Sequence, residues 1–188
     1  MAAASIKFAK IDNRPIKLFF QDEGRFGRIN SLSKCWMSPG KRAIVGRQIV
    51  REFIYAFSSV CPETGENFSL IFPRADTDTM NIYLNMLSEE YKKYRIILFM
   101  DKAGWHTCKR LKISENIAII YLPPYSPELN PVEHIWKYIR TTKGFNNKVY
   151  STIEKVEDKL CEALKEIYYD KITIKSLCYY KWMHYTIS

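Results

Sequence analysis

The sequence predicts a mixed α/β fold, in which an antiparallel meander of strands is followed by helices that alternate with buried strands. Three observations support this fold class. Apolar and alternating segments, separated by turn residues, recur up to residue 72. From residue 77 the apolar residues take the spacing of a helix. Two later runs, 96–100 and 117–122, are apolar throughout, which is typical of strands buried in a parallel part of a sheet.

Four segments of the first half are expected to be strands because they are apolar or alternate between apolar and polar residues. They are 16–22, 42–47, 52–61 and 67–72. Gly24, Gly27 and residues 30–33 follow the first segment and have the composition of turns. Residues 62–65 supply a turn that makes the last two segments antiparallel neighbours.

Four helices are expected after residue 76. They are predicted at 77–91, 131–143, from 151 onward and at 172–185. Gly144 closes the second helix, and a capping box formed by Ser151 and Glu154 opens the third. No repeat or linker is visible, so we expect residues 1–188 to form a single domain.

The composition is that of a globular protein, with 47% hydrophobic and 26% charged residues. The longest apolar run, 117–122, has six residues, whereas a membrane-spanning helix needs about 20. The start of the chain has no apolar stretch of secretory-signal length. Five cysteines without a C-x-x-C pair predict reduced thiols rather than disulfides or a zinc site. These features favour a cytoplasmic protein and exclude the membrane, secreted and zinc-finger classes.

The positive charge is concentrated near the start of the chain. Residues 1–51 hold eleven Lys or Arg and three acids, whereas residues 52–188 hold eighteen bases and seventeen acids. This asymmetry indicates an anionic partner, and nucleic acid is the first candidate. A solvated basic surface without a partner explains the charge equally well.

Two predicted strands run directly into an aspartate, Asp22 and Asp101. If both strands are parallel in one sheet, the two carboxylates meet at its carboxyl edge, where open α/β sheets bind ligands. Neighbouring carboxylates repel unless a cation lies between them, and Mg²⁺ or Mn²⁺ prefers such oxygen ligands. Taken singly, each aspartate is explained more simply as a turn residue.

A third acid, Glu133, lies in the first turn of the predicted helix 131–143. With Asn130 as the N-cap and Pro131 at the first helical position, Glu133 fits a capping arrangement, and it also stands four residues before Lys137. On a helical wheel it falls at the border of the apolar stripe. A cap and a metal ligand are equally consistent with this position.

Three segments together resemble the catalytic blocks of DDE transposases, most closely the bacterial insertion-sequence branch of the mariner superfamily. They are FQDEGRFG at 20–27, MDKAGWH at 100–106 and LPPYSPELNPVEHIW at 122–136. The proline-rich block is the most specific of the three. The resemblance runs from about residue 16 to residue 144.

The resemblance implies a ribonuclease-H-like fold in which two Asp and one Glu bind a pair of divalent metals. Carried over to this sequence, the catalytic and metal-binding triad is Asp22, Asp101 and Glu133. Asp22 would bridge two Mg²⁺ or Mn²⁺ ions, Asp101 would mainly hold one and Glu133 the other. Two such ions can clamp an in-line phosphoryl displacement, which implies metal-dependent DNA cleavage and strand transfer for the mobility of an insertion sequence.

Two departures from the family pattern stand out. Lys102 occupies a position where the family usually has Asn. Relatives also carry an amino-terminal helix-turn-helix domain, which we expect to be absent because only 21 residues precede Asp22. An upstream chain that supplies this domain is therefore an expected partner. A homodimer on DNA is expected from the resemblance alone, and so is action on the bacterial nucleoid.

Several further residues are candidates for contacts with the DNA backbone, transposon ends and target included. They are Arg25, Arg28, Lys34, Lys41, Arg42, Arg47, Lys102, His106 and Arg140. His106 is equally well explained as a residue that orients a carboxylate, or as a structural histidine. Trp36 is a candidate for stacking on a base, or for an anchor in the core or in an interface. Tyr125 is expected to close the loop before the Glu133 helix.

Transposase activity is the leading functional prediction. Two alternatives remain: a ribonuclease-H-type nuclease, which would hydrolyse nucleic acid without strand transfer, and an inactive transposase relic that binds DNA through its basic first quarter.

Overall fold

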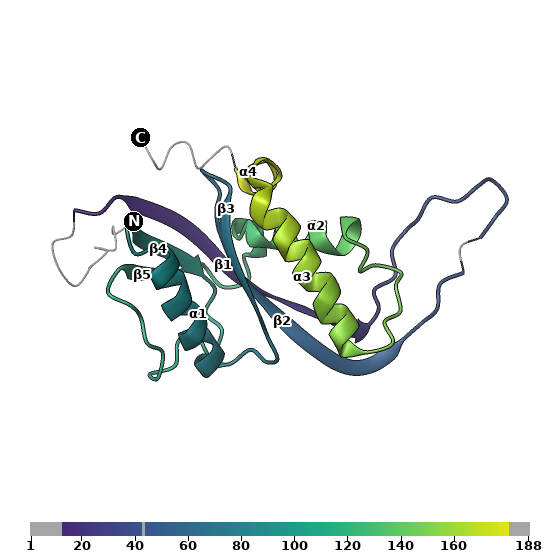
Figure 1. Ribbon diagram of the computed structural model, residues 1–188, viewed down its shortest axis with the longest axis horizontal. Helices are drawn as coiled ribbons and strands as arrows, with labels where there is room; N and C mark the ends of the chain where they lie inside the picture. Colours follow the sequence, from purple (N-terminus) through teal and green to yellow (C-terminus); the bar gives the residue numbers. More distant parts are fainter. Residues whose placement is uncertain (1–12, 43, 181–188) are drawn as a thin grey trace.

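A computed structural model describes residues 13–42 and 44–180 of the 188-residue chain. Its centre is one five-stranded mixed sheet of order β3-β2-β1-β4-β5 (Figure 1). β1 pairs antiparallel with β2 and parallel with β4, so the sheet joins a meander to a parallel half, as predicted. The strands are β1 Ile16–Ile29, β2 Ile49–Cys61, β3 Glu66–Phe72, β4 Arg95–Met100 and β5 Ile117–Tyr121.

The expected turn at Gly24 and Gly27 is wrong, because β1 continues through both residues to Ile29. Gly24 pairs with Ala56 and Gly27 with Phe53 of β2. A Cβ on Gly27 would lie 2.2 Å from the carbonyl oxygen of Glu52. The small residues therefore permit close packing inside a long strand rather than a change of chain direction.

The strand expected at 42–47 is also wrong. These residues belong to the connection 30–48, which has no regular structure where it is described, and β2 begins only at Ile49. The described side chains of 42–47 are mostly exposed. Alternation without a partner strand or a covering layer does not make a strand. Residues 30–33 lie outside regular structure, as expected of turn material.

The helices occur close to their predicted positions. They are α1 Thr77–Glu90, α2 Val132–Thr142, α3 Ile153–Tyr169 and α4 Lys171–Cys178, with a 3-10 turn η1 at Pro127–Leu129. The capping box expected at Ser151 and Glu154 is wrong, because Thr152 is the N-cap of α3 and its side chain accepts from the amide of Lys155. The predicted helix 172–185 begins at Lys171 and ends at Cys178, and residues 181–185 lie outside the described range.

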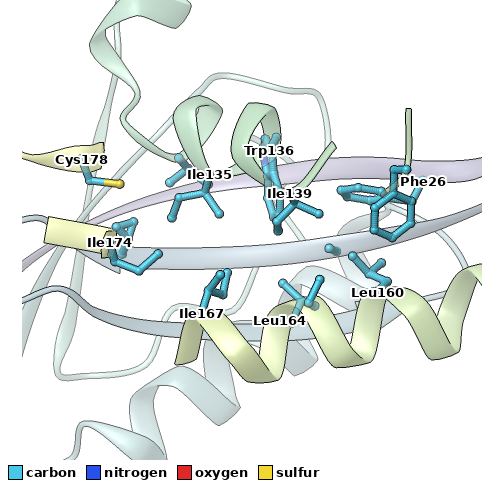
Figure 2. Packing of buried hydrophobic residues seen from close by; sticks show 14 of the residues in the cluster. Phe26, Ile135, Trp136, Ile139, Leu160, Leu164, Ile167, Ile174 and Cys178 are labelled. Carbon is cyan, nitrogen blue, oxygen red and sulfur yellow. The ribbon is translucent and has the colours of Figure 1, made fainter. Parts of the chain in front are cut away.

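Helices cover both faces of the sheet. α1 packs on one face with Phe19 and Phe57, whereas α2, α3 and α4 pack on the other with Phe20 and Phe26. Figure 2 shows this second core, in which Trp136 and Ile139 of α2 and Leu160 and Leu164 of α3 point into one apolar layer. Burial of apolar surface on both faces, at about 25 cal/mol per Å², holds the layers together.

None of the helices formed by residues 13–42 and 44–180 has the length and apolar character that crossing a membrane requires.

Candidate active site

The parallel pairing of β1 with β4 brings the two predicted aspartates to the same edge of the sheet. The last pair in this register joins Phe20 to Phe99, and Asp22 and Asp101 each follow two residues later. β1 continues beyond this point against β2, whereas β4 ends at Met100. Asp22 is therefore fixed within a strand, while Asp101 begins a loop.

Asp22 is partly buried beneath α2. Its Oδ2 accepts a hydrogen bond of 2.8 Å from the indole Nε1 of Trp136. Burial, and then the nearby charges of Glu23 and Glu133, raise the pKa of Asp22 to about 8, although the Trp136 hydrogen bond works in the opposite direction. The surroundings of Asp22 therefore disfavour its negative charge.

Asp101 is the more accessible aspartate, with a side chain 58% exposed. Its Oδ1 lies 2.7 Å from His106 Nδ1 and accepts a 3.0 Å hydrogen bond from the amide of Ala103. The His106 hydrogen bond lowers the pKa of Asp101, which stays ionised at neutral pH. Both contacts are made to Oδ1, so Oδ2 is the oxygen open to another ligand.

Glu133 is positioned by the way α2 begins. Asn130 donates from Nδ2 to the carbonyl oxygen of Gln21, at 3.0 Å, and its Oδ1 accepts from the amide of Val132, at 3.3 Å. This side chain fastens the start of α2 to β1 next to Asp22, but the expected N-cap role is wrong, because Pro131 occupies the N-cap position and no side chain caps the helix there. Glu133 itself is exposed, and the ion pair with Lys137 considered from the sequence is not formed between these two described residues.

All three predicted carboxylates line one pocket of about 360 Å³. The remaining wall comes from the loops after β4 and β5, and it consists of Lys102, Ala103, Leu122, Pro123, Pro124, Tyr125, Ser126, Pro127 and Asn130. Within the described part of the chain, no three His, Cys, Asp or Glu side chains stand close enough together to hold a metal ion as placed. The structure thus brings the three acids to one pocket, but their side chains are not placed close enough to coordinate one metal ion together.

Glu23 is a residue that the sequence reasoning missed. It is adjacent to Asp22 but points to the opposite face of β1, where its side chain is only 8% exposed. Its Oε1 lies 2.8 Å from His106 Nε2 and accepts a hydrogen bond from Gln21 Nε2. The alternation of a strand was the available signal, since it places the side chain after Asp22 on the buried face. Trp136, which is buried in the core, additionally donates a hydrogen bond to Asp22.

His106 is buried, with a side chain 1% exposed, and both ring nitrogens contact carboxylates. Burial lowers its pKa, but the hydrogen bonds to Asp101 and Glu23 outweigh this effect and raise the pKa to about 9. Such a ring has no free donor for DNA phosphate. Its contacts agree with the other sequence interpretation, that His106 orients a carboxylate.

The predicted DNA-contacting cations are distributed unevenly around the pocket. Lys102 lines it, and Arg140 is partly buried on α2, where burial lowers its pKa in spite of the charges of Glu133 and Asp22. Arg28 is engaged within the protein, with Glu52 at 2.7 Å and the carbonyl oxygen of Tyr150 at 3.0 Å. The others are exposed, Arg25 on β1 and four on the connection 30–48: Lys34, Lys41, Arg42 and Arg47.

Two aromatic residues differ from the simpler sequence expectations. Trp36 is fully exposed on the connection between β1 and β2, so it is not a core residue. Tyr125 is also fully exposed, with a positive φ of 57°, and does not close the loop before α2 as expected. Both side chains are available for contacts outside the domain.

Solved structures with a similar fold identify the architecture. A pre-cleavage Mos1 transpososome matches with a TM-score of 0.62 and 17% identity, over 87% of this chain and 56% of that one. The Mos1 mariner paired-end complex with Mn matches with a TM-score of 0.61 and 18% identity, over 85% and 52%. This chain therefore shares the ribonuclease-H-like fold of those structures and spans about half the length of their transposase chains.

The sequence comparison then gives the family. Residues 17–157 match the family described as DDE superfamily endonuclease, and the chain belongs to this family. A relative from Sinorhizobium fredii, the uncharacterized protein y4pE/y4sA, is 32% identical over 131 residues, which cover 69% of this chain and 96% of that protein. The membership in the DDE enzymes and the mixed ribonuclease-H-like sheet, both expected from the sequence, are confirmed.

Proposed function

We propose that this chain is the catalytic part of a transposase, which cleaves DNA strands and joins them to a target with the help of divalent metal ions. The observation that carries the proposal is the pocket itself. Three carboxylates from separate segments line this pocket at the carboxyl edge of a parallel strand pair: Asp22, Asp101 and Glu133. Membership in the DDE endonuclease family supports the same chemistry.

The donor set suits a hard divalent cation, since it consists of carboxylate oxygens. Asp22, Asp101 and Glu133 would hold two Mg²⁺ or Mn²⁺ ions, which polarise the phosphoryl group and activate the attacking hydroxyl when bound. The raised pKa of Asp22 supports this assignment, because a cation in the pocket would offset the repulsion from Glu23 and Glu133. Mos1 paired-end complexes are known with Mn and with Mg.

The surrounding residues prepare the carboxylates for this role. Trp136 holds one oxygen of Asp22, and Asn130 fixes the start of the helix that carries Glu133. Lys102 in the pocket and Arg140 on α2 add positive charge next to the acids. Charges of this kind would bind a DNA phosphate and stabilise the charge that develops during its transfer.

DNA is the partner that the charge pattern favours, and in this proposal it comprises the transposon ends and the target. The two finer parts of the proposal are pairing of two copies on DNA and recognition of the ends by a helix-turn-helix on a separate chain. The described residues form one sheet covered by helices, and this architecture supports the single-domain organisation. The proposed place of action is the nucleoid in the bacterial cytoplasm.

The direct test is cleavage of DNA by variants of the three acids. Asp22→Asn, Asp101→Asn and Glu133→Gln should each lower Mg²⁺- or Mn²⁺-dependent nicking at least about 100-fold, since each removes a negative ligand of the site. Glu128→Gln, which changes an exposed acid in η1, is the matched control and should nick like the parent. Unchanged nicking by folded triad variants would overturn the assignment.

The same assay separates the related functions. Joining of a DNA 3′ end to a second duplex supports a transposase, whereas hydrolysis of RNA–DNA hybrids alone would indicate a ribonuclease-H-type nuclease. DNA binding that survives EDTA, with no cleavage under any metal, would indicate an inactive relic.

A further inference from the structure

A continuous chain of three side chains lies behind the candidate site. Glu23 Oε1 is 2.8 Å from His106 Nε2, and His106 Nδ1 is 2.7 Å from Asp101 Oδ1. Glu23 and His106 are buried, with side chains 8% and 1% exposed, whereas Asp101 is 58% exposed. The chain thus runs from the sheet interior to a carboxylate on the pocket wall.

The buried part of this chain is fixed from several directions. Gln21 Nε2 donates to Glu23 Oε1 at 3.0 Å, from the same face of β1. The amide of His106 donates to the carbonyl oxygen of Ala103, and the hydroxyl of Tyr121 donates to the carbonyl oxygen of His106 at 2.7 Å. The imidazole is therefore held by Glu23 of β1, and the backbone of His106 is held by Tyr121 at the end of β5.

Asp101 itself lacks the support of a strand. It follows the last residue of β4, and its side chain is oriented by two donors, His106 Nδ1 and the amide of Ala103, which both reach Oδ1. Two donors on one oxygen turn the carboxylate so that the other oxygen is available. Metal-ligating side chains, carboxylates included, are commonly oriented by hydrogen bonds from residues of an outer shell. Here His106 would orient Asp101, and Glu23 would orient the His106 ring.

We propose that Glu23 and His106 are positioning residues, which hold Asp101 with Oδ2 presented to the pocket as its divalent-cation ligand. This inference rests on the proposed function, because it assumes that Asp101 binds the cation. Neither Glu23 nor His106 touches the cation or the DNA. Their role is to keep one ligand in place just beyond the end of β4.

Two substitutions of His106 separate positioning from simple packing. The amide nitrogen of Asn in His106→Asn takes the place of Nδ1 and keeps a donor toward Asp101. The amide of Gln in His106→Gln instead takes the place of Nε2 and keeps the contact with Glu23. Both variants remove the ring, so a packing role predicts equal effects. A positioning role predicts that only His106→Gln loses the hydrogen bond that orients Asp101.

The measurement is Mn²⁺ binding by the full chain, by calorimetric titration without DNA, together with the thermal midpoint in metal-free buffer. His106→Asn should bind Mn²⁺ within about 3-fold of the parent, and His106→Gln about 10- to 100-fold more weakly. Glu23→Gln and Glu23→Met give a second pair at the other end of the chain. The first retains an acceptor for His106 and should bind like the parent, whereas the second should bind about 10-fold more weakly.

The outcomes distinguish this inference from the proposed function. If the parent binds Mn²⁺ and Asp101→Asn weakens it, while His106→Gln and Glu23→Met bind like the parent, the positioning role is overturned and the site stands. Equal weakening by both members of each pair likewise overturns it in favour of packing. If the parent does not bind Mn²⁺, the proposed function and this inference fall together.

Discussion

At the scale of single residues, the environment of Asp22 disfavours its negative charge in the absence of a bound cation. Its carboxyl group is partly buried, and its pKa of about 8 lies far above that of an aspartate in an unfolded chain. Between these two pKa values the folded protein retains a proton that the unfolded chain has released. The metal-free protein should therefore lose stability as the pH rises from about 4 to about 8.

Substitution of Asp22 tests this effect. Asp22→Asn removes the charge and should stabilise the metal-free protein at pH 8 by more than about 1 kcal/mol, because one unit of pKa shift corresponds to about 1.4 kcal/mol. At pH 4 the same variant should have nearly the stability of the parent. Urea unfolding at the two pH values gives both numbers. A difference that does not depend on pH would show that burial does not disfavour the charge of Asp22.

The residues of the site were predictable to different degrees. Asp22 and Asp101 each follow an apolar run of the sequence, and a parallel register of the two runs was enough to place them together. The contact of His106 with Asp101 was one of several open interpretations. Glu23 was missed because the predicted strand ended at Asp22. The alternation that places Glu23 on the buried face of β1 was therefore not extended to it.

At the scale of elements, β1 determines the geometry of the site. It is 14 residues long, and it pairs with β4 in its first part and with β2 in its later part. Asp22 lies within the later part, so the strand must continue past it. Gly27 allows this continuation, because any side chain there would collide with the backbone of β2.

A glycine substitution tests the long strand. Gly27→Ala should destabilise the protein by about 1–3 kcal/mol, as overpacking against a fixed backbone does. Gly104→Ala is the matched control, since a Cβ at Gly104 has no atom within 4 Å, and it should change stability by less than about 0.5 kcal/mol. Denaturant unfolding of the two variants is the measurement. Equal stability of both would mean that the chain turns at Gly27 after all.

The elements that the sequence predicted well are those with strong apolar patterns. The buried stripe of α1 and the apolar strands β4 and β5 depend on their own residues and on simple burial. Gly24 and Gly27 were misread because glycine marks both turns and close strand packing. The segment 42–47 was misread because alternation says nothing about whether a partner strand is present.

At the scale of the whole molecule, the uneven charge has a specific location. Four of the predicted DNA-contacting cations, Lys34, Lys41, Arg42 and Arg47, lie on the exposed connection 30–48, which extends away from the sheet (Figure 1). An exposed basic segment of this kind favours phosphate contacts that do not depend on base sequence. The sequence predicted the charge excess, but not that this segment would be a connection outside the sheet.

The salt dependence of DNA binding tests this arrangement. Substitution of all four cations by Gln should reduce the slope of log affinity against log salt by up to about 3.6, since each neutralised phosphate contributes about 0.9. The same number of charges removed from the exposed Lys92, Lys93, Lys155 and Lys165 should change the slope by less than about 1. Similar losses from the two sets would indicate an unspecific effect of net charge.

The account depends most on whether Asp22, Asp101 and Glu133 share metal ions. Crystals of the protein soaked in Mn²⁺ and measured at the manganese absorption edge test this directly. We predict anomalous density in the pocket, within about 2.0–2.3 Å of an oxygen from each carboxylate, Oδ2 in the case of Asp101. Density elsewhere, or three carboxylates that point apart with no ion between them, would contradict the proposed catalytic site.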